Sequence, residues 1–108
     1  MNINSKIKEA LLKKSQGDIS GAESIFLEIL NISPLQYEVL INLGLIYVHK
    51  KMYETSIYYF KQAVEADKNN IDPYINLGNV YTLKKNYTNA IQFFELGHKI
   101  DQTNLNVI

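Results

Sequence analysis

A six-residue segment that occurs twice constrains the fold of this chain more than any other feature of its sequence. Residues 42–47 read Asn-Leu-Gly-Leu-Ile-Tyr, and residues 76–81 read Asn-Leu-Gly-Asn-Val-Tyr, an offset of 34 residues from Gly44 to Gly78. Four further pairs share this offset: Tyr53 with Tyr87, Phe60 with Phe94, Asp67 with Asp101, and Asn70 with Asn104. Because the match extends over a whole unit, the sequence indicates a repeat protein whose units stack and bury a continuous core.

Apolar residues within each unit recur every three or four positions, which is typical of an α-helix with one buried face. Leu40, Leu43, Gly44 and Tyr47 form such a stripe. Helices are expected over residues 3–14, from 19 or 20 to 32, and over 36–50, 53–66, 72–84 and 87–100. Short polar turns should pair them as antiparallel neighbours. The sequence therefore predicts an all-α fold of three tandem helix-turn-helix repeats.

The repeats are expected at residues 3–36, 37–70 and 71–104 of a single domain that covers residues 1–108. Residues 101–108 match residues 67–74 in spacing and character, so a polar turn and then the start of a fourth unit, at 105–108, are expected there. No linker-like or low-complexity stretch interrupts the chain. We expect one continuous array that ends within a repeat.

Composition argues against several classes of function. Eleven basic and eleven acidic side chains cancel, which gives no general attraction to nucleic acid or to anionic lipid. No segment has the apolar length of a signal peptide or a membrane span, and there is no cysteine for disulfides or thiolate chemistry. We expect a cytoplasmic protein that binds neither nucleic acid nor membrane.

Gly44 and Gly78 fall in the middle of expected helices, where glycine costs about 1 kcal/mol relative to alanine. Without a Cβ, the first helix of a hairpin can press against its partner, and we expect this close approach near Ser56 or Ala90. A larger side chain at either glycine should cost roughly 1–3 kcal/mol by overpacking. These glycines therefore predict tight packing within each hairpin.

The pattern Leu-Gly-x-x-Tyr, followed by small-x-x-x-Phe at a 34-residue period, resembles the tetratricopeptide repeat family. The second unit carries the signature at Leu40, Leu43, Gly44, Tyr47, Tyr53, Ser56 and Phe60, and the third at Tyr74, Leu77, Gly78, Tyr81, Tyr87, Ala90 and Phe94. The first unit keeps Gly17-Asp18, Ala22, Phe26 and Pro34, but has Lys6, Glu9, Ala10 and Lys13 at other signature positions. Its first helix is expected to be a solvated cap. The resemblance implies a short right-handed α-solenoid that serves as a scaffold for protein partners.

No arrangement of side chains indicates catalysis. His49 and His98 fall on different helices, without a cysteine, second histidine or paired carboxylate at ligand spacing. Neither Gly78-Asn79-Val80 nor Gly97-His98-Lys99 has the glycine spacing of a phosphate-binding loop. We therefore predict a protein that is not an enzyme and that has no metal and no cofactor.

Two lysine pairs, Lys50-Lys51 and Lys84-Lys85, also repeat at the 34-residue interval. Lysine at a helix C-terminus interacts favourably with the helix dipole, which is the favoured interpretation. The alternative is a basic ridge that binds anions along one edge of the array.

In tetratricopeptide arrays the first helices of successive pairs line a concave groove, and the resemblance implies a peptide-binding site there. The candidate binding residues are Asn42, Asn76, Ile41, Leu45, His49, Ile75, Asn79 and Leu83. Asparagine amides both donate to and accept from a peptide unit, so Asn42 and Asn76 could hold the backbone of an extended segment. Arrays in protein glycosyltransferases use such an asparagine ladder. The alternative is that asparagine is simply frequent, both at this position in the family and in this chain.

A second use of the groove in this family, a clamp for the carboxylate tail of chaperones, is not expected here. Asn42 fits the clamp, but Ile7, Leu11, Asp72 and Asn76 stand where its other polar or basic residues are required. A carboxylate would meet Asp72 instead of a lysine, and like charges repel.

The leading functional hypothesis is a protein-interaction scaffold that binds a peptide segment in the groove. The second is the recruiting arm of a larger enzyme, for example a glycosyltransferase. The third is homo-oligomerisation through an uncapped C-terminal repeat, because repeat arrays normally end in a polar cap. Here the end face is expected to carry apolar residues, namely Ile91, Phe94 and Ile100, followed by Leu105, Val107 and Ile108.

Overall fold

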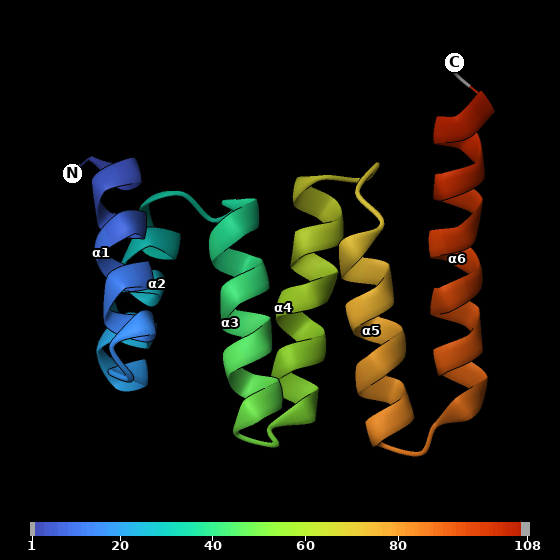
Figure 1. The fold of residues 1–108 in the computed structure, drawn as a ribbon, viewed down its shortest axis with the longest axis horizontal. Helices are drawn as coiled ribbons and strands as arrows, with labels where there is room; N and C mark the ends of the chain where they lie inside the picture. Colours follow the sequence, from blue (N-terminus) through green and yellow to red (C-terminus); the bar gives the residue numbers. More distant parts are fainter. Residues whose placement is uncertain (1, 107–108) are drawn as a thin grey trace.

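The computed structural model describes residues 2–106, and within this range the chain forms six α-helices and no β-strand. The helices are α1 (Ile3–Ser15), α2 (Ile19–Ile32), α3 (Tyr37–His49), α4 (Tyr53–Ala66), α5 (Asp72–Leu83) and α6 (Tyr87–Asn106). Figure 1 shows them as three hairpins in chain order, with α1 and α2 at one end and α6 at the other. The predicted all-α fold of tandem helix-turn-helix repeats is confirmed.

Each hairpin turns through a residue with a positive φ angle, and the three residues lie 34 positions apart. They are Gly17 (φ 87°), Lys51 (φ 61°) and Lys85 (φ 61°). The next amide in each turn donates back to the preceding helix at 2.8 Å, as Met52 N does to Tyr47 O. The equivalent bonds join Asp18 to Lys13 and Asn86 to Tyr81. This is the Schellman arrangement, which satisfies carbonyl groups at a helix end and sets the hairpin geometry.

The second helices of the hairpins differ in how they begin. Asp18 caps α2, because its Oδ1 accepts from the Gly21 amide at 2.9 Å. Asn86 accepts from the Asn89 amide at 3.3 Å and caps α6 in the same way. Met52 holds the equivalent position before α4 and makes no side-chain cap. The second helix of the middle hairpin therefore lacks the stabilising N-cap hydrogen bond that the other two second helices have.

The mid-helix glycines make room for an aromatic ring. A Cβ at Gly44 would lie 2.4 Å from Cε1 of Phe60, and a Cβ at Gly78 would lie 2.4 Å from Cε1 of Phe94. The expected tight packing within each hairpin is present. The atoms that require it belong to these phenylalanine rings, and not to the small residues Ser56 or Ala90 where the sequence placed the contact.

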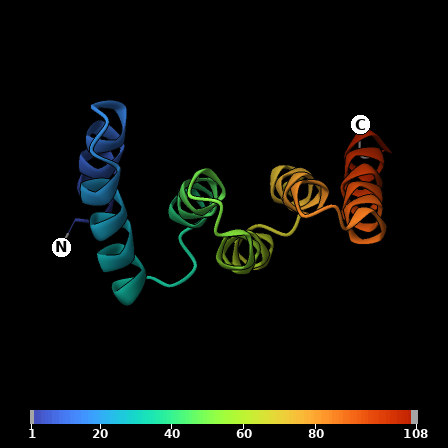
Figure 2. The same ribbon diagram turned by 90° about the horizontal axis from the view of Figure 1, so that it is seen from below.

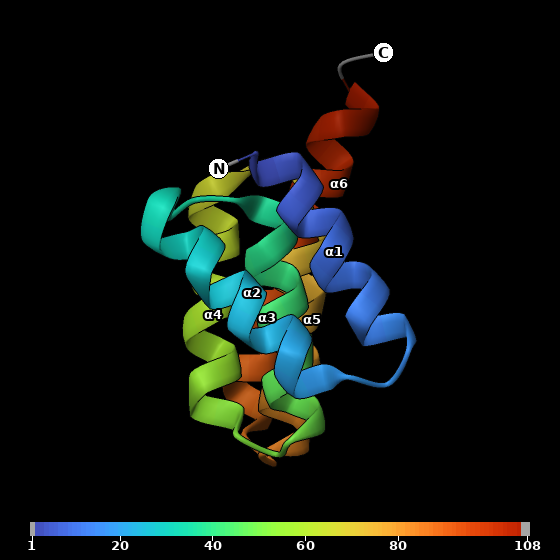
Figure 3. The same ribbon diagram turned by 90° about the vertical axis from the view of Figure 1, so that its left-hand side faces the viewer.

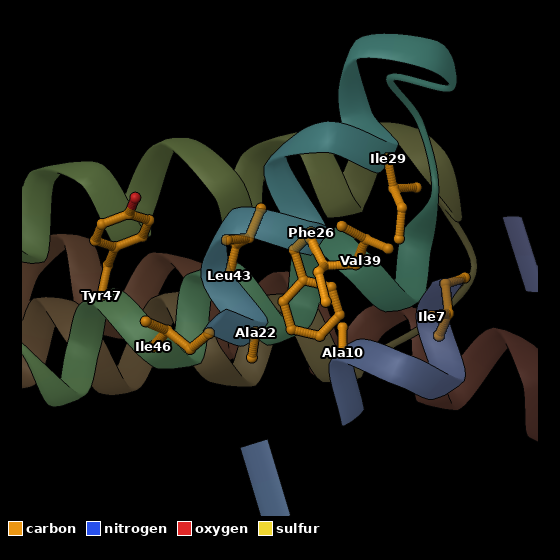
Figure 4. Close-up of a cluster of buried hydrophobic side chains, with 10 residues drawn as sticks. Ile7, Ala10, Ala22, Phe26, Ile29, Val39, Leu43, Ile46 and Tyr47 are labelled. Atoms are coloured by element: carbon orange, nitrogen blue, oxygen red, sulfur yellow. The ribbon is translucent and has the colours of Figure 1, made fainter. Parts of the chain in front are cut away.

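Two clusters of buried side chains form the core. The first joins α1, α2 and α3, and nine of its residues are labelled in Figure 4, with the ring of Phe26 among Ala10, Ala22 and Val39. The second joins α4, α5 and α6 through Ile57, Phe60, Leu77, Val80, Tyr81 and Ala90. Two stacked aromatic pairs occupy equivalent positions in the second and third hairpins. The ring centres of Tyr47 and Tyr59 lie 5.6 Å apart, and those of Tyr81 and Phe93 lie 5.5 Å apart.

A polar contact fastens the first hairpin to α3. The Glu23 carboxylate on α2 accepts from the Tyr47 hydroxyl at 2.5 Å, and Lys50 Nζ lies 2.5 Å from its other oxygen. The bonds from Lys50 and Tyr47 lower the pKa of Glu23 below its usual value, whereas burial and the Glu23 contact raise the pKa of the Tyr47 phenol. The carboxylate therefore stays ionised at neutral pH.

The first helix is more than a solvated cap. Its outer face is exposed, but Ile7 and Ala10 are buried in the first core cluster. Figure 3 shows α1 and α2 in front of the rest of the array when that end faces the viewer. The departures from the repeat signature in α1 therefore leave its inner face apolar.

The last helix is longer than the sequence predicts. It continues to Asn106, although residues 101–104 resemble the turn at 67–70. A polar segment ends a helix where the next helix packs back on it, and no helix follows α6 within the described residues. That a fourth unit begins at 105–108 stays a prediction, since residues 107 and 108 lie outside the described range.

Candidate functional site

The first helices of the hairpins lie on one side of the array. Seen from below in Figure 2, α3 and α5 follow one side and α4 the other. The candidate binding residues lie on these first helices, so the contacts of α1, α3 and α5 on this side decide what the surface can bind.

A hydrogen bond between Lys14 and Asn42 crosses from α1 to α3. Lys14 Nζ donates to Asn42 Oδ1 at 2.8 Å, and Asn42 Nδ2 donates to the Glu38 carbonyl oxygen at 2.8 Å. The side chain of Asn42 is accordingly only 9% exposed. An amide has two donors and two acceptor positions, so half of this capacity is already used inside the chain.

Two hollows flank this hydrogen bond, and together we call them the α1–α3 groove. One, of about 270 Å³, is lined by Lys14, Ile19, Leu45, Ile46 and His49 and is referred to as the Lys14 hollow. The other, of about 340 Å³, is lined by Asn4, Ile7, Lys8, Leu11 and Glu38. Predicted residues Leu45 and His49 therefore share one hollow, whereas the second is built from residues that the sequence did not single out as binding residues.

Three of the four predicted residues of α5 are exposed to solvent. Ile75 is 41% exposed and Leu83 is 52% exposed, Asn79 is exposed, and Asn76 is half-buried. Asn76 makes no side-chain hydrogen bond to any described residue, in contrast to Asn42. The absence of a bond equivalent to Lys14–Asn42 is explained one unit back, because the residue equivalent to Lys14 is Val48, whose side chain has no donor. Ile41 is half-buried and packs against the second core cluster.

Lys14, in the last turn of α1, is a candidate binding residue that was not predicted from the sequence. The 34-residue offset did contain the signal. Leu11, Leu45 and Asn79 occupy one position in successive units, and Lys14 follows Leu11 by three residues on the same helix face. Its partner Asn42 lies 28 residues away, so the contact itself depends on how the units stack.

One lysine of each repeated pair faces a carboxylate. Lys50 pairs with Glu23 and Lys84 pairs with Glu54, each on the second helix of the preceding hairpin. Their ammonium groups also lie 5.6 Å and 5.7 Å from the ring centres of Tyr47 and Tyr81. For Lys50 and Lys84, these contacts favour the structural interpretation over an anion-binding ridge.

Neither a cluster of metal ligands nor a membrane-spanning helix occurs among the residues that the structure describes. Across the described part of the chain, no three or more histidine, cysteine, aspartate or glutamate side chains are grouped so that they could hold a metal ion. Over the same residues, no helix combines the length and the apolar character needed to cross a membrane.

Comparison with known proteins identifies the repeat. A model described as TPR repeat matches residues 44–85, and a model described as tetratricopeptide repeat matches residues 71–104. Comparison with curated proteins gave no match.

Several solved structures share the fold. The second TPR of Spaghetti (RPAP3), bound to an HSP90 peptide, is 16% identical with a TM-score of 0.81, and the match covers 93% of each chain. MamA is 12% identical with a TM-score of 0.91, and the match covers 96% of this chain and 61% of MamA. The O-GlcNAc transferase of Thermobaculum terrenum is 23% identical with a TM-score of 0.80, over 91% of this chain and 19% of the transferase. At these identities the likeness establishes the helical-solenoid fold alone.

Proposed function

This chain belongs to the tetratricopeptide repeat family, and from that membership we propose that it is a non-enzymatic scaffold that binds a peptide segment of a partner protein along its first helices. The observation that carries the proposal is a set of apolar side chains that the fold leaves uncovered on these helices. Leu45 and Ile75 are each 41% exposed, and Leu83 is 52% exposed, while Leu43 and Leu77 on the same helices are fully buried. Exposed apolar residues that share a face favour an interaction surface.

Polar groups on the same helices suit an extended backbone. Asn76 is half-buried and has its full hydrogen-bonding capacity within the described structure, and Asn42 retains one donor and one acceptor. Each hydrogen bond to a peptide unit should contribute about 0.5–1.5 kcal/mol. Together with Ile41, Leu45, His49, Ile75, Asn79 and Leu83, the two asparagines would give micromolar affinity, of the order of −8 kcal/mol.

Support also comes from a related fold. The RPAP3 domain matches this chain over nearly its whole length and is bound to a peptide from HSP90. The HSP90 peptide is the ligand of RPAP3, and it is not assigned to this chain. For this chain we propose only a peptide ligand, because Asp72 lies at a position where a clamp for an acidic tail needs a basic residue.

The test is an array of short random peptides probed with the labelled protein, followed by titration of the best binder. Replacing both Asn42 and Asn76 with alanine should weaken that binding about tenfold without changing the helix content seen by circular dichroism. Asn69→Ala, in the exposed turn before α5, is the matched control. Equal affinity of the double variant and the control would eliminate the asparagine ladder, and the absence of any bound peptide would eliminate the proposed function.

A second candidate function is self-association through α6. Ile91 is 57% exposed and Phe94 is 38% exposed, although the equivalent residues one unit earlier, Ile57 and Phe60, are buried by the following hairpin. Another copy packed on α6 would cover this surface. Sedimentation velocity over a range of concentrations tests it, because a monomer at all concentrations contradicts self-association.

The third candidate is that the chain acts as the recruiting arm of an enzyme. This candidate is supported by the match in fold to the O-GlcNAc transferase of Thermobaculum terrenum, which covers 19% of the transferase chain. The measurement is the molecular mass of the native protein, since a mass that matches this chain alone would contradict it.

A further inference from the structure

We propose that the Lys14 hollow binds a carboxylate next to an aliphatic side chain, such as an acidic residue beside a leucine in a partner peptide. The inference rests on the proposed peptide-binding function and specifies the chemistry of the ligand. It follows from the charge of Lys14, the position that Asn42 gives it, and the apolar walls of the hollow.

The charge of Lys14 is not neutralised within the described structure. Lys6, Lys13, Lys50 and Lys84 each lie within 4 Å of a carboxylate oxygen, from Glu9, Asp18, Glu23 and Glu54 respectively. Lys14 has as its hydrogen-bond partner the neutral amide oxygen of Asn42. An ammonium group has three donors, so two remain for a ligand. A carboxylate would be both the matching charge and the matching acceptor.

Asn42 is a positioning residue for this ammonium group. Its Nδ2 is committed to the Glu38 carbonyl oxygen, which fixes the amide so that Oδ1 is directed at Lys14. Lys14 is half-buried, so its long side chain is restrained before any ligand arrives. A restrained donor loses less conformational entropy on binding than a free surface lysine.

The walls of the hollow are apolar. Ile19, Leu45 and Ile46 surround Lys14, and Leu45 is the most exposed of the three. His49 adds ring nitrogens that can donate or accept. The volume of about 270 Å³ is below the roughly 300–1,000 Å³ of pockets for drug-sized ligands. One or two side chains of a peptide fit this size.

Nearby acidic groups do not cancel the charge. Asp18 lies at the start of α2 but pairs with Lys13, and Glu38 lines the other hollow. The next pair of first helices provides an internal comparison, because Val48, Asn79 and Leu83 stand where the Lys14 hollow has Lys14, Leu45 and His49. A cation above an apolar wall therefore occurs between α1 and α3 and is not a general property of this repeat.

The smallest probe of this chemistry is N-acetyl-L-leucine, which carries a carboxylate beside an isobutyl group, with neutral N-acetyl-L-leucinamide as its control. We expect titration into the isotopically labelled protein to shift the NMR signals of Leu45, His49 and Lys14. The amide should bind at least about fivefold more weakly, because it lacks the charge that a partly exposed lysine attracts.

Lys14→Gln tests the charge, since glutamine can still donate to Asn42. We expect it to weaken N-acetyl-L-leucine binding at least about fivefold, whereas Lys68→Gln, which removes an exposed lysine from the turn after α4, leaves it unchanged. If Lys14→Gln perturbs the fold, Leu45→Gln is the second variant, because Leu45 is exposed and its loss removes the apolar wall.

Equal binding of the acid and the amide, or unchanged binding to Lys14→Gln, would overturn the inference. Its failure is distinct from failure of the proposed function. If peptides bind through Asn76 with no preference for acidic residues, the proposed peptide-binding function stands and the proposed carboxylate site at the Lys14 hollow is wrong. If N-acetyl-L-leucine binds specifically but no peptide does, the carboxylate site stands and the proposed peptide-binding function is wrong.

Discussion

The ring of Phe60 occupies the space that a side chain at Gly44 would need, since a Cβ there would lie 2.4 Å from the ring. The same relationship joins Phe94 and Gly78. The two rings differ in what surrounds them, because Phe60 is fully buried and Phe94 is 38% exposed. A buried ring cannot move aside without disturbing its neighbours, whereas Phe94 can shift toward solvent.

Substitution of the two glycines by alanine should therefore have unequal effects. Overpacking at Gly44→Ala should cost roughly 1–3 kcal/mol, offset in part by the gain of about 1 kcal/mol in helix propensity. Gly78→Ala should be close to neutral or slightly stabilising. Urea unfolding of both variants checks this, and a Gly78→Ala protein that is less stable than Gly44→Ala would contradict it.

The uncapped start of α4 offers a stabilising change. Met52→Asp should supply the side-chain acceptor that Asp18 and Asn86 provide at equivalent positions. The expected gain in the free energy of unfolding is about 1 kcal/mol, within the 0.5–2 kcal/mol range of N-caps. Thermal unfolding measures it, with Met52→Ala as the control for loss of the methionine. A Met52→Asp variant no more stable than Met52→Ala would show that the N-cap does not form.

The Glu23 contact should make stability depend on pH. Its folded-state pKa is lowered from 4.5, so its contribution is fully present above that pH and is lost as the pH falls through the lowered value. Glu23→Gln should cost about 1 kcal/mol at neutral pH, because the side chains of Glu23 and Lys50 are partly exposed to solvent.

That difference between the wild type and Glu23→Gln should shrink as the pH falls below 4.5, because protons then compete with Lys50 and Tyr47 for the wild-type carboxylate. Urea unfolding of both proteins from about pH 7 to about pH 3 tests this. A difference that stays constant over the whole range would show that the lost stability comes from packing and not from the charge.

The sequence determined most of the fold, because the 34-residue offset locates the buried stripe and the turn of each hairpin. Helix α4 has the predicted bounds of 53–66, and the ends of α3 and α5 differ from prediction by only one residue. The turns at Lys51 and Lys85 hold the conformation that Gly17 holds in the first unit, although lysine rarely adopts it. Position in the repeat, and not residue type, sets the backbone there.

The candidate site could be predicted only in part. Equivalent positions in a repeat have equivalent backbones, but their side chains meet whatever the preceding unit provides. Asn42 meets Lys14 and is held, whereas Asn76 meets no donor because Val48 precedes it. Lys14, whose equivalents in the next two units are Val48 and Thr82, thus gives the hollow its charge, and only the stacked structure shows that it contacts Asn42.

The central claim is that partner peptides bind along the first helices. The most direct measurement is NMR mapping of the isotopically labelled protein with the best peptide from the array. The largest shifts should fall on the candidate binding residues of the first helices, including Leu45, His49, Asn76 and Asn79. Shifts confined instead to Tyr58 and Leu27 on the second helices, or to Ile91 on α6, would contradict it.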